Sequence, residues 1–166
     1  MHSAKRRAGA PVEATFTKVE PRTVDGRAIG PGVAYDYYEG AWTALPEFEK
    51  LNPTASGVRA DVSLKASPRD SNYALRFHGY LEIKTPGSYT FTLGSDDGAR
   101  LIIDGETALN MDGIHGVVTQ SKAVDLKTGW HKVIILYFQG VGGADLGFRY
   151  EGPGVSVREP RLWCQQ

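Results

Sequence analysis

The sequence predicts an all-β protein, an antiparallel β-sandwich or barrel of about nine strands. Short runs of alternating apolar and polar residues, rich in β-branched and aromatic side chains, recur along the chain. Twenty glycines and nine prolines in 166 residues separate those runs, as the turns of such a fold require. A chain of this length fits one domain with a substantial core.

Charge and cysteine content exclude several classes of function. Lys+Arg and Asp+Glu both number 19, so the net charge of zero gives no electrostatic reason to expect a nucleic-acid or anionic-membrane partner. No run approaches the roughly 18 apolar residues of a membrane span, so no direct membrane insertion is predicted. Cys164 is the only cysteine, which excludes an internal disulfide framework and a cysteine-based zinc site.

The first part of the chain predicts an arm, two strands and one helical turn. Residues 1–31 hold several prolines and glycines and are predicted to be an N-terminal arm or linker, with Ala14–Val19 as a candidate edge strand. Residues 32–39 are aromatic and alternating and give the first firm strand. Residues 43–51 space apolar side chains three apart and predict one short helical turn. Alternation returns in residues 58–64, which predict the next strand.

The middle of the chain predicts a meander of strands. Residues 73–84 alternate over their whole length and continue the same parity past Gly79, so this glycine is predicted to allow close packing or a bulge. Residues 88–94 and 99–104 predict two more strands. An Asp-Gly pair at the end of the second is a hairpin signal.

Two polar, glycine-rich loops and three further strands complete the predicted domain. The loop Leu109–Gly116 is longer than a minimal hairpin and is a candidate functional loop, the alternative being a solvated connection. The loop Gln139–Asp145 contains three glycines. The remaining strands are predicted at residues 121–127, 130–138 and 146–150. The domain is predicted to span residues 32–155, with a C-terminal tail at residues 156–166.

Two adjacent carboxylates lie between two predicted strands, in the tetrapeptide Ser95-Asp96-Asp97-Gly98. Neighbouring side chains on a regular strand point to opposite faces, so both aspartates can serve one site only where the backbone is irregular, which Gly98 favours. A hard cation such as calcium suits the pair, because it takes six to eight oxygen ligands. The alternative is ordinary hairpin-turn chemistry. The tetrapeptide alone leaves both interpretations open.

Six segments, in order along the chain, resemble those of one known family. They are Tyr37–Gly40, Trp42, Phe77–Leu81, Gly87–Gly105, Gly129–Lys132 and Tyr137-Phe138. Over residues 32–155 the chain resembles the protective-antigen-fourteen domain, a module of bacterial toxins, yeast flocculins and adhesins, bacterial adhesins and glycosidases. The resemblance implies a β-barrel or sandwich of jelly-roll character.

The resemblance also implies a calcium site. In lectin members of the family, two aspartates joined by a cis peptide hold calcium beside the sugar site, and Asp96 and Asp97 match that pair. A second loop supplies further oxygens in those members, and the Gln139–Asp145 loop occupies the corresponding place. The implied ligands there are the side chains of Asp145 and Gln139 and the carbonyl of Val141. The yeast adhesins place an asparagine in this loop, and the present sequence has none there.

The loop at Asn110–Gly116 resembles a segment of the domain found beside bacterial glycoside hydrolases. By that resemblance, Asp112 and His115 line a glycan site next to the calcium ion, and Gly140 and Gly142 let the glycan approach the cation. For His115 the alternative is a hydrogen bond that orders the loop.

The predicted function is calcium-dependent glycan binding, either in adhesion or in targeting an attached enzyme to polysaccharide, with a structural spacer as the alternative. No enzyme is predicted, because adjacent carboxylates that share a cation are ion ligands rather than an acid and a nucleophile held about 5 Å apart. We expect a lectin-like, secreted or cell-surface module, monomeric by itself and part of a larger multidomain protein.

Overall fold

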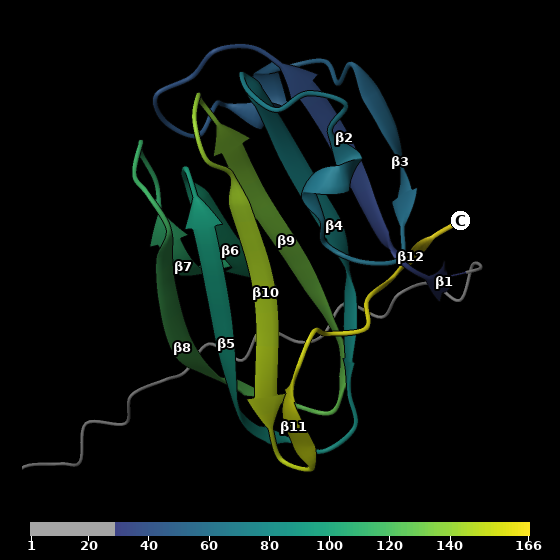
Figure 1. The fold of residues 1–166 in the computed structure, drawn as a ribbon. Helices are drawn as coiled ribbons and strands as arrows, with labels where there is room; N and C mark the ends of the chain where they lie inside the picture. Colours follow the sequence, from purple (N-terminus) through teal and green to yellow (C-terminus); the bar gives the residue numbers. More distant parts are fainter. Residues whose placement is uncertain (1–28) are drawn as a thin grey trace, which may run out of the picture.

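The computed structural model describes residues 29–166, which form two antiparallel β-sheets packed face to face (Figure 1). Residues 1–28, with the candidate strand Ala14–Val19, lie outside the described residues. The predicted all-β class is confirmed: residues 29–166 contain twelve strands, against about nine predicted, and two short 3-10 turns. In the same residues, no helix combines the length and apolar character needed to cross a bilayer.

The larger sheet has eight strands, ordered β1-β12-β4-β9-β6-β7, with β2 paired to β4 and to β3. The smaller sheet has four strands, ordered β11-β10-β5-β8. The strands of the larger sheet are β1 (Ile29–Pro31), β2 (Val33–Glu39), β3 (Ala55–Arg59), β4 (Tyr73–Ile83), β6 (Ala99–Ile103), β7 (Glu106–Met111), β9 (Gly129–Gln139) and β12 (Trp163–Gln165). Those of the smaller sheet are β5 (Gly87–Asp96), β8 (Val118–Leu126), β10 (Asp145–Gly152) and β11 (Val155–Arg158).

The core lies between the sheets and follows from the alternation of the strands. Odd-numbered side chains of β4, β5 and β9 point inward and are buried, whereas many even-numbered ones are partly exposed. Phe91 of β5 stacks against Phe148 of β10 within this core. A second, smaller cluster covers the outer face of the larger sheet, where Phe48 packs edge-on against Tyr38. Phe48 belongs to the 3-10 turn η1 (Phe48–Lys50), which agrees with the helical turn predicted near residues 43–51.

Several predicted elements differ from the structure. The strand predicted at residues 58–64 lies earlier, at Ala55–Arg59, because pairing with β2 ends at Arg59 and the 3-10 turn η2 (Leu64–Ala66) follows. The predicted meander over residues 73–104 is wrong, since β5 belongs to the smaller sheet and both its neighbours in the chain, β4 and β6, belong to the larger one. Strand β7 extends to Met111, into the predicted loop. Residues 29–31 and 163–165, predicted as arm and tail, pair with each other as β1 and β12.

Three connections between the sheets lie side by side at one end of the sandwich (Figure 1). Strands β9, β6 and β7 are neighbours in the larger sheet, and β10, β5 and β8 are neighbours in the smaller one. Residues 140–144 join β9 to β10, residues 97–98 join β5 to β6, and residues 112–117 join β7 to β8. The aspartate pair therefore lies in the central connection, flanked by both loops that the sequence marks as candidates.

Candidate functional site

Asp97 links the three connections through one carboxylate. Its side chain is buried, at 3% exposure. Oδ1 accepts a hydrogen bond from the backbone N–H of His115 at 3.2 Å, and Oδ2 accepts one from the backbone N–H of Gly140 at 2.9 Å. The peptide bond between Asp96 and Asp97 is cis, as the family resemblance implies. The tetrapeptide is thus not a hairpin turn, because it crosses from one sheet to the other.

The carboxylates of Asp96 and Asp97 both lie against the Gln139–Asp145 loop, at positions occupied by glycine. A Cβ atom on Gly140 would lie 3.2 Å from Asp97 Oδ2, and one on Gly143 would lie 3.3 Å from Asp96 Oδ2. These separations are tighter than most Cβ contacts, so larger residues would crowd the two carboxylates. The loop therefore approaches the aspartate pair closely because it is rich in glycine.

Tyr137 and Gln139 hold the end of β9 against the central connection. The Tyr137 hydroxyl lies 2.6 Å from the backbone oxygen of Asp96 and 2.8 Å from Gln139 Oε1, and both oxygens can accept its proton. Gln139 Nε2 donates to the backbone oxygen of Gly143 at 2.7 Å. Burial, together with the neighbouring Tyr73, raises the pKa of the Tyr137 hydroxyl well above its ordinary value, so it stays protonated. The Gln139 side chain, predicted as a metal ligand, thus uses both its amide oxygen and its amide nitrogen in hydrogen bonds within the protein.

Gly98 completes the close approach of the central connection to β9. A Cβ atom at this position would lie 2.4 Å from Cε1 of Phe138 and 3.0 Å from the backbone nitrogen of Gly113. The backbone N–H of Phe138 donates to the Gly98 carbonyl at 3.0 Å. Close packing therefore requires glycine after the aspartate pair.

In the connection of residues 112–117, the His115 ring forms hydrogen bonds within its own loop. Nδ1 lies 2.7 Å from the backbone oxygen of Gly116, and Nε2 lies 2.9 Å from that of Met111. Burial lowers the pKa of the imidazole, but these two carbonyl oxygens and the Asp97 and Asp96 charges outweigh it, so the pKa lies above its ordinary value. The ring contacts correspond to the loop-ordering alternative, and the backbone of His115 is what touches Asp97.

Asp112 anchors the same loop to the segment before η1. Its Oδ1 accepts hydrogen bonds from the backbone N–H groups of Leu45 and Gly113, each at 2.7 Å. Its Oδ2 lies 3.8 Å from Nη2 of Arg100. The structure therefore places Asp112 near the site but commits its carboxylate to contacts within the protein.

Asp145 lies directly opposite Asp96 in the pairing of β10 with β5, and its side chain is exposed. Within residues 29–166, no group of three or more His, Cys, Asp or Glu side chains is arranged to hold a metal ion. The side chains brought together are thus those of Asp96 and Asp97, with Asp145 nearby on the adjacent strand. Of the other predicted residues, Gly140 contacts Asp97, whereas Val141 and Gly142 are exposed in the loop.

No Lys, Arg or His side chain forms an ion pair with Asp96, Asp97 or Asp145 in the described part of the chain. Two acidic side chains, with a third on the adjacent strand, therefore lie at one end of the sandwich without a counter-charge of that kind. Carboxylates so placed favour a bound cation, since their oxygens are ligands for hard metal ions.

Sequence reasoning missed Tyr137 and Gly143 as residues that shape the site, and it missed the close packing of Gly98 against Phe138. Tyr137 lies in a continuous apolar run, and its only signal is that a buried tyrosine hydroxyl needs a hydrogen-bond partner. The roles of the two glycines depend on which connections lie side by side, which only the sheet order shows.

The fold is a β-sandwich whose central inter-sheet connection carries an aspartate pair, opposite a glycine-rich loop. This combination characterises the domain. The chain belongs to the PA14 domain family, whose sequence profile matches residues 30–161. A comparison with curated protein sequences finds no match.

Solved structures with the same fold include a domain of an antifreeze protein and domains of two adhesins. The PA14 domain of the antifreeze protein MpAFP has a TM-score of 0.67 at 14% identity, covering 83% of this chain and 93% of that one. The PA14 sugar-binding domain from an RTX adhesin has a TM-score of 0.63 at 23% identity, covering 80% and 95%. The A domain of epithelial adhesin 9 from Candida glabrata, in complex with Galβ1-4GlcNAc, has a TM-score of 0.61 at 14% identity, covering 83% and 91%.

Proposed function

We propose that this PA14 domain binds carbohydrate through a calcium ion held by Asp96 and Asp97. The observation that carries the proposal is the convergence of these two carboxylates on one glycine-rich loop, without a paired cationic side chain in residues 29–166. Calcium prefers carboxylate and carbonyl oxygens, which are the donors present here.

The donor set fits such an ion. Each oxygen of Asp97 accepts one backbone hydrogen bond, which leaves a further lone-pair position on each for a cation. Gly140 and Gly143 leave the space next to the carboxylates free of side chains. Because acidic side chains alone do not complete a cage, we propose the Val141 carbonyl, the Asp145 carboxylate and ligand or water oxygens as the remaining donors. Gln139 is assigned to support of the loop, since its side chain already bonds to Tyr137 and Gly143.

A bound calcium ion supplies coordination positions for the vicinal hydroxyls of a sugar. The chain itself provides apolar contacts on either side of that position. Val141, in the Gln139–Asp145 loop, is 75% exposed, and Ile114, in the loop of residues 112–117, is 64% exposed. Such side chains at the two rims can pack against the C–H face of a sugar ring, while Gly142 allows the glycan to approach.

The relatives support a glycan as the ligand class. A domain named as sugar-binding and an adhesin domain in complex with Galβ1-4GlcNAc share this fold. We propose a role in adhesion or in bringing an attached enzyme to polysaccharide, for a module of a secreted or cell-surface protein. We propose no hydrolytic role, because adjacent carboxylates on one cation do not form the separated pair that glycoside hydrolysis needs.

The test uses the metal-free domain. Calcium chloride is titrated calorimetrically, and a glycan array is then probed with and without chelator. We expect calcium binding and chelator-sensitive glycan binding in wild type, and loss of both in the Asp96→Asn, Asp97→Asn double variant. The control is Asp125→Asn, which removes an exposed carboxylate near the other end of β8, opposite Ser88. If wild type ignores calcium and every glycan, the domain is a structural spacer.

A further inference from the structure

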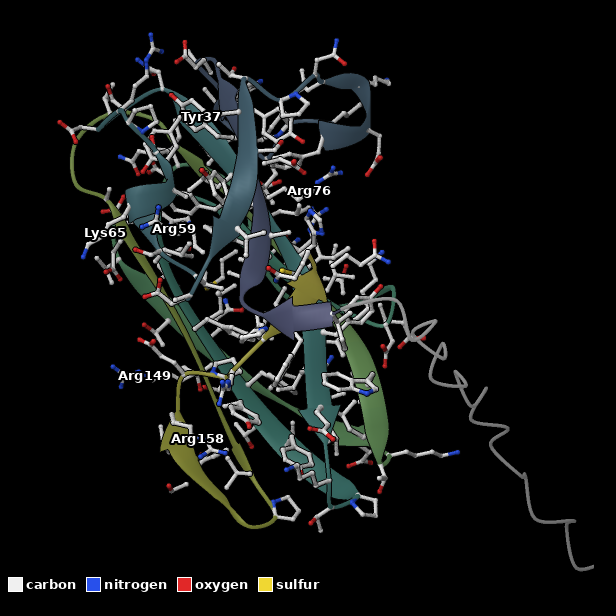
Figure 2. The ribbon with its side chains drawn as sticks, turned by 90° about the vertical axis from the view of Figure 1, so that its right-hand side faces the viewer. Tyr37, Arg59, Lys65, Arg76, Arg149 and Arg158 are labelled. Atoms are coloured by element: carbon white, nitrogen blue, oxygen red, sulfur yellow. The ribbon has the colours of Figure 1, made fainter. Side chains whose placement is uncertain are left out.

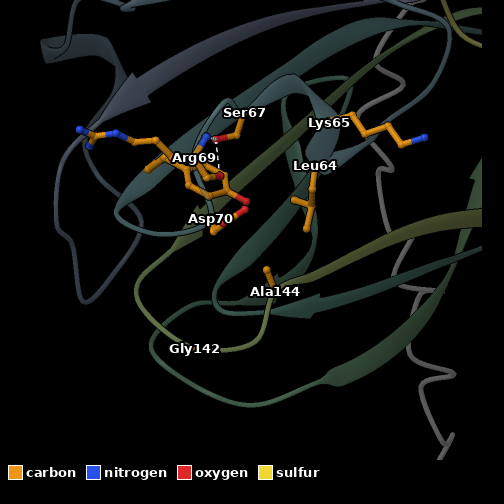
Figure 3. A pocket seen from close by; sticks show the side chains of 8 residues that line it. Leu64, Lys65, Ser67, Arg69, Asp70, Gly142 and Ala144 are labelled. Carbon is orange, nitrogen blue, oxygen red and sulfur yellow. Dashed lines mark hydrogen bonds between the residues drawn. The ribbon is translucent and has the colours of Figure 1, made fainter.

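The loop that contacts the aspartate pair also lines a cleft of about 490 Å³ (Figure 3). Gly142 and Ala144 form one side of this cleft, and the opposite side comes from the connection between β3 and β4, with Leu64, Ser67 and Asp70. The volume lies within the range of about 300–1,000 Å³ that ligand pockets occupy. Apart from Gly142, the residues named here have no role in the site proposed at Asp96 and Asp97.

The cleft combines an apolar wall with one open carboxylate. Leu64 and Ala144 face each other across it, and the Asp70 side chain points into the space between the two sides (Figure 3). The hydrogen bonds drawn among the lining residues join only Ser67 and Arg69, so no lining residue occupies the Asp70 oxygens. Lys65 and Arg69 also line the cleft, but their charged ends extend away from Asp70, and Arg69 pairs with Glu39 at 3.4 Å.

This chemistry selects the type of molecule that the cleft can hold. A carboxylate that accepts hydrogen bonds suits hydroxyl donors and repels anions. The apolar side chains suit a C–H surface. A neutral sugar residue offers both features, whereas an acidic sugar would place a second negative charge near Asp70.

The cleft and the proposed calcium site are adjacent, because neighbouring residues of the same loop contact each of them. Gly143 is the residue packed against Asp96, and its two neighbours in the chain, Gly142 and Ala144, line the cleft. Consecutive Cα atoms are about 3.8 Å apart, so the two positions are separated by little more than the width of one loop. Linked residues of one glycan chain can bridge such a separation.

We infer that this cleft binds a second, neutral sugar residue of a glycan whose terminal residue is held at Asp96 and Asp97. The inference rests on the proposed function. It makes the domain selective for oligosaccharides over single sugars, and it assigns that selectivity to Asp70 and the wall opposite Ala144.

Calorimetry of the calcium-loaded domain tests the inference with matched sugars. The probes are galactose, glucose and mannose, and the oligosaccharides that end in them: lactose, cellotriose and mannotriose. In at least one series we expect the oligosaccharide to bind wild type at least tenfold more tightly than its monosaccharide. Trigalacturonate should show no such gain over galacturonate.

Two substitutions at Asp70 assign the gain to the cleft. Asp70→Ala removes the acceptor and Asp70→Trp fills the space, and both should reduce oligosaccharide affinity about tenfold while leaving monosaccharide and calcium affinity unchanged. Asp70 is exposed, so both variants are expected to fold. The control is Asp61→Ala, which removes an exposed carboxylate from the same connection without lining this cleft.

The possible failures are distinguishable. Calcium-dependent binding of a monosaccharide with no gain in any wild-type series overturns the cleft and leaves the proposed function standing. The cleft inference is also overturned if the higher affinity for the oligosaccharide over its monosaccharide is retained in Asp70→Trp. If no sugar binds in the presence of calcium, the proposed function fails and the cleft inference falls with it.

Discussion

Asp36 and Asp97 are both buried aspartates, but the protein satisfies them in opposite ways. Asp36, on β2, is 9% exposed and accepts hydrogen bonds from the Ser56 hydroxyl at 2.6 Å and from Nε and Nη2 of Arg76 at 3.0 and 2.9 Å. Asp97 accepts two backbone N–H groups, and no cationic side chain pairs with it in residues 29–166. Figure 2 shows Arg76 on the side of the molecule away from Lys65 and Arg149.

The difference separates a structural carboxylate from one available to an external ion. Burial raises the pKa of Asp36, but hydrogen bonds from Ser56 and Arg76 and the charges of Arg76 and His78 outweigh it, so the pKa lies below its ordinary value. Its charge is therefore neutralised inside the fold. The charge of Asp97 is held by backbone groups alone, which favours a cation from solution.

The largest effect expected from this contrast is stabilisation by calcium. A ligand at 100 times its dissociation constant stabilises the folded state by about 2.7 kcal/mol. We expect that gain in wild type and in Asp36→Asn, and none in Asp97→Asn. Urea unfolding with and without calcium measures it. Equal gains in both variants would show that Asp97 does not hold the ion.

Removal of Arg76 tests the other side of the comparison. Arg76→Met leaves Asp36 without its cation, and we expect a loss of about 2 kcal/mol in the free energy of unfolding, with or without calcium. The control is Arg69→Ala, which breaks the exposed pair with Glu39 and should cost less than about 1 kcal/mol. Equal costs for the two variants would contradict the structural role of the Asp36–Arg76 pair.

A single methyl group can probe the space beside the aspartate pair. Gly143→Ala places a Cβ atom 3.3 Å from Asp96 Oδ2, whereas Gly147→Ala meets nothing within 4 Å. We expect the first change to weaken calcium binding about tenfold, or about 1.4 kcal/mol, and the second to leave it unaltered. Calorimetry measures both. If neither change weakens binding, the ion does not lie beside the Asp96 carboxylate and Gly143.

The smallest expected effect is a pH dependence of stability that appears only below about pH 4. Because the folded pKa of Asp36 is lowered, its contribution is present above the ordinary value of 3.8 and is lost as pH falls through the folded value. Wild type should therefore lose stability more steeply below about pH 4 than Asp36→Asn does. Denaturant unfolding across pH 2 to 6 gives the free energy of unfolding of both proteins as a function of pH. Parallel curves would show that the Asp36–Arg76 pair does not cause the loss of stability in acid.

Local patterns along the chain were sufficient to predict the long strands but not the short ones. Strand β4 is identified in the sequence by its alternation, and β9 by its continuous apolar run. Strands β1 and β12 have three residues each and form through pairing with each other and, for β12, with β4, so nothing local marks them. Strand β3 was misplaced because its pairing with β2, rather than its own alternation, sets its bounds.

The site was predictable in its centre and less so in its surroundings. The family resemblance located Asp96, Asp97 and the facing loop, which the sheet order brings together. The engagement of Gln139 with Tyr137, and of the His115 ring with its own loop, depends on side-chain orientation after folding. No pattern of residue types or spacing in the sequence specifies those contacts.

The pairing of β1 with β12 has a mechanical consequence. Ile29 lies opposite Gln165, so the two points where the described chain enters and leaves the domain are neighbours on its side, away from the inter-sheet loops (Figure 1). Ladder hydrogen bonds run perpendicular to the strands, so tension applied at these two residues would peel β1 from β12 one pair at a time. Because β12 also pairs with β4 at Tyr80, the tension would next reach the larger sheet there, on the side of the domain rather than at its inter-sheet loops.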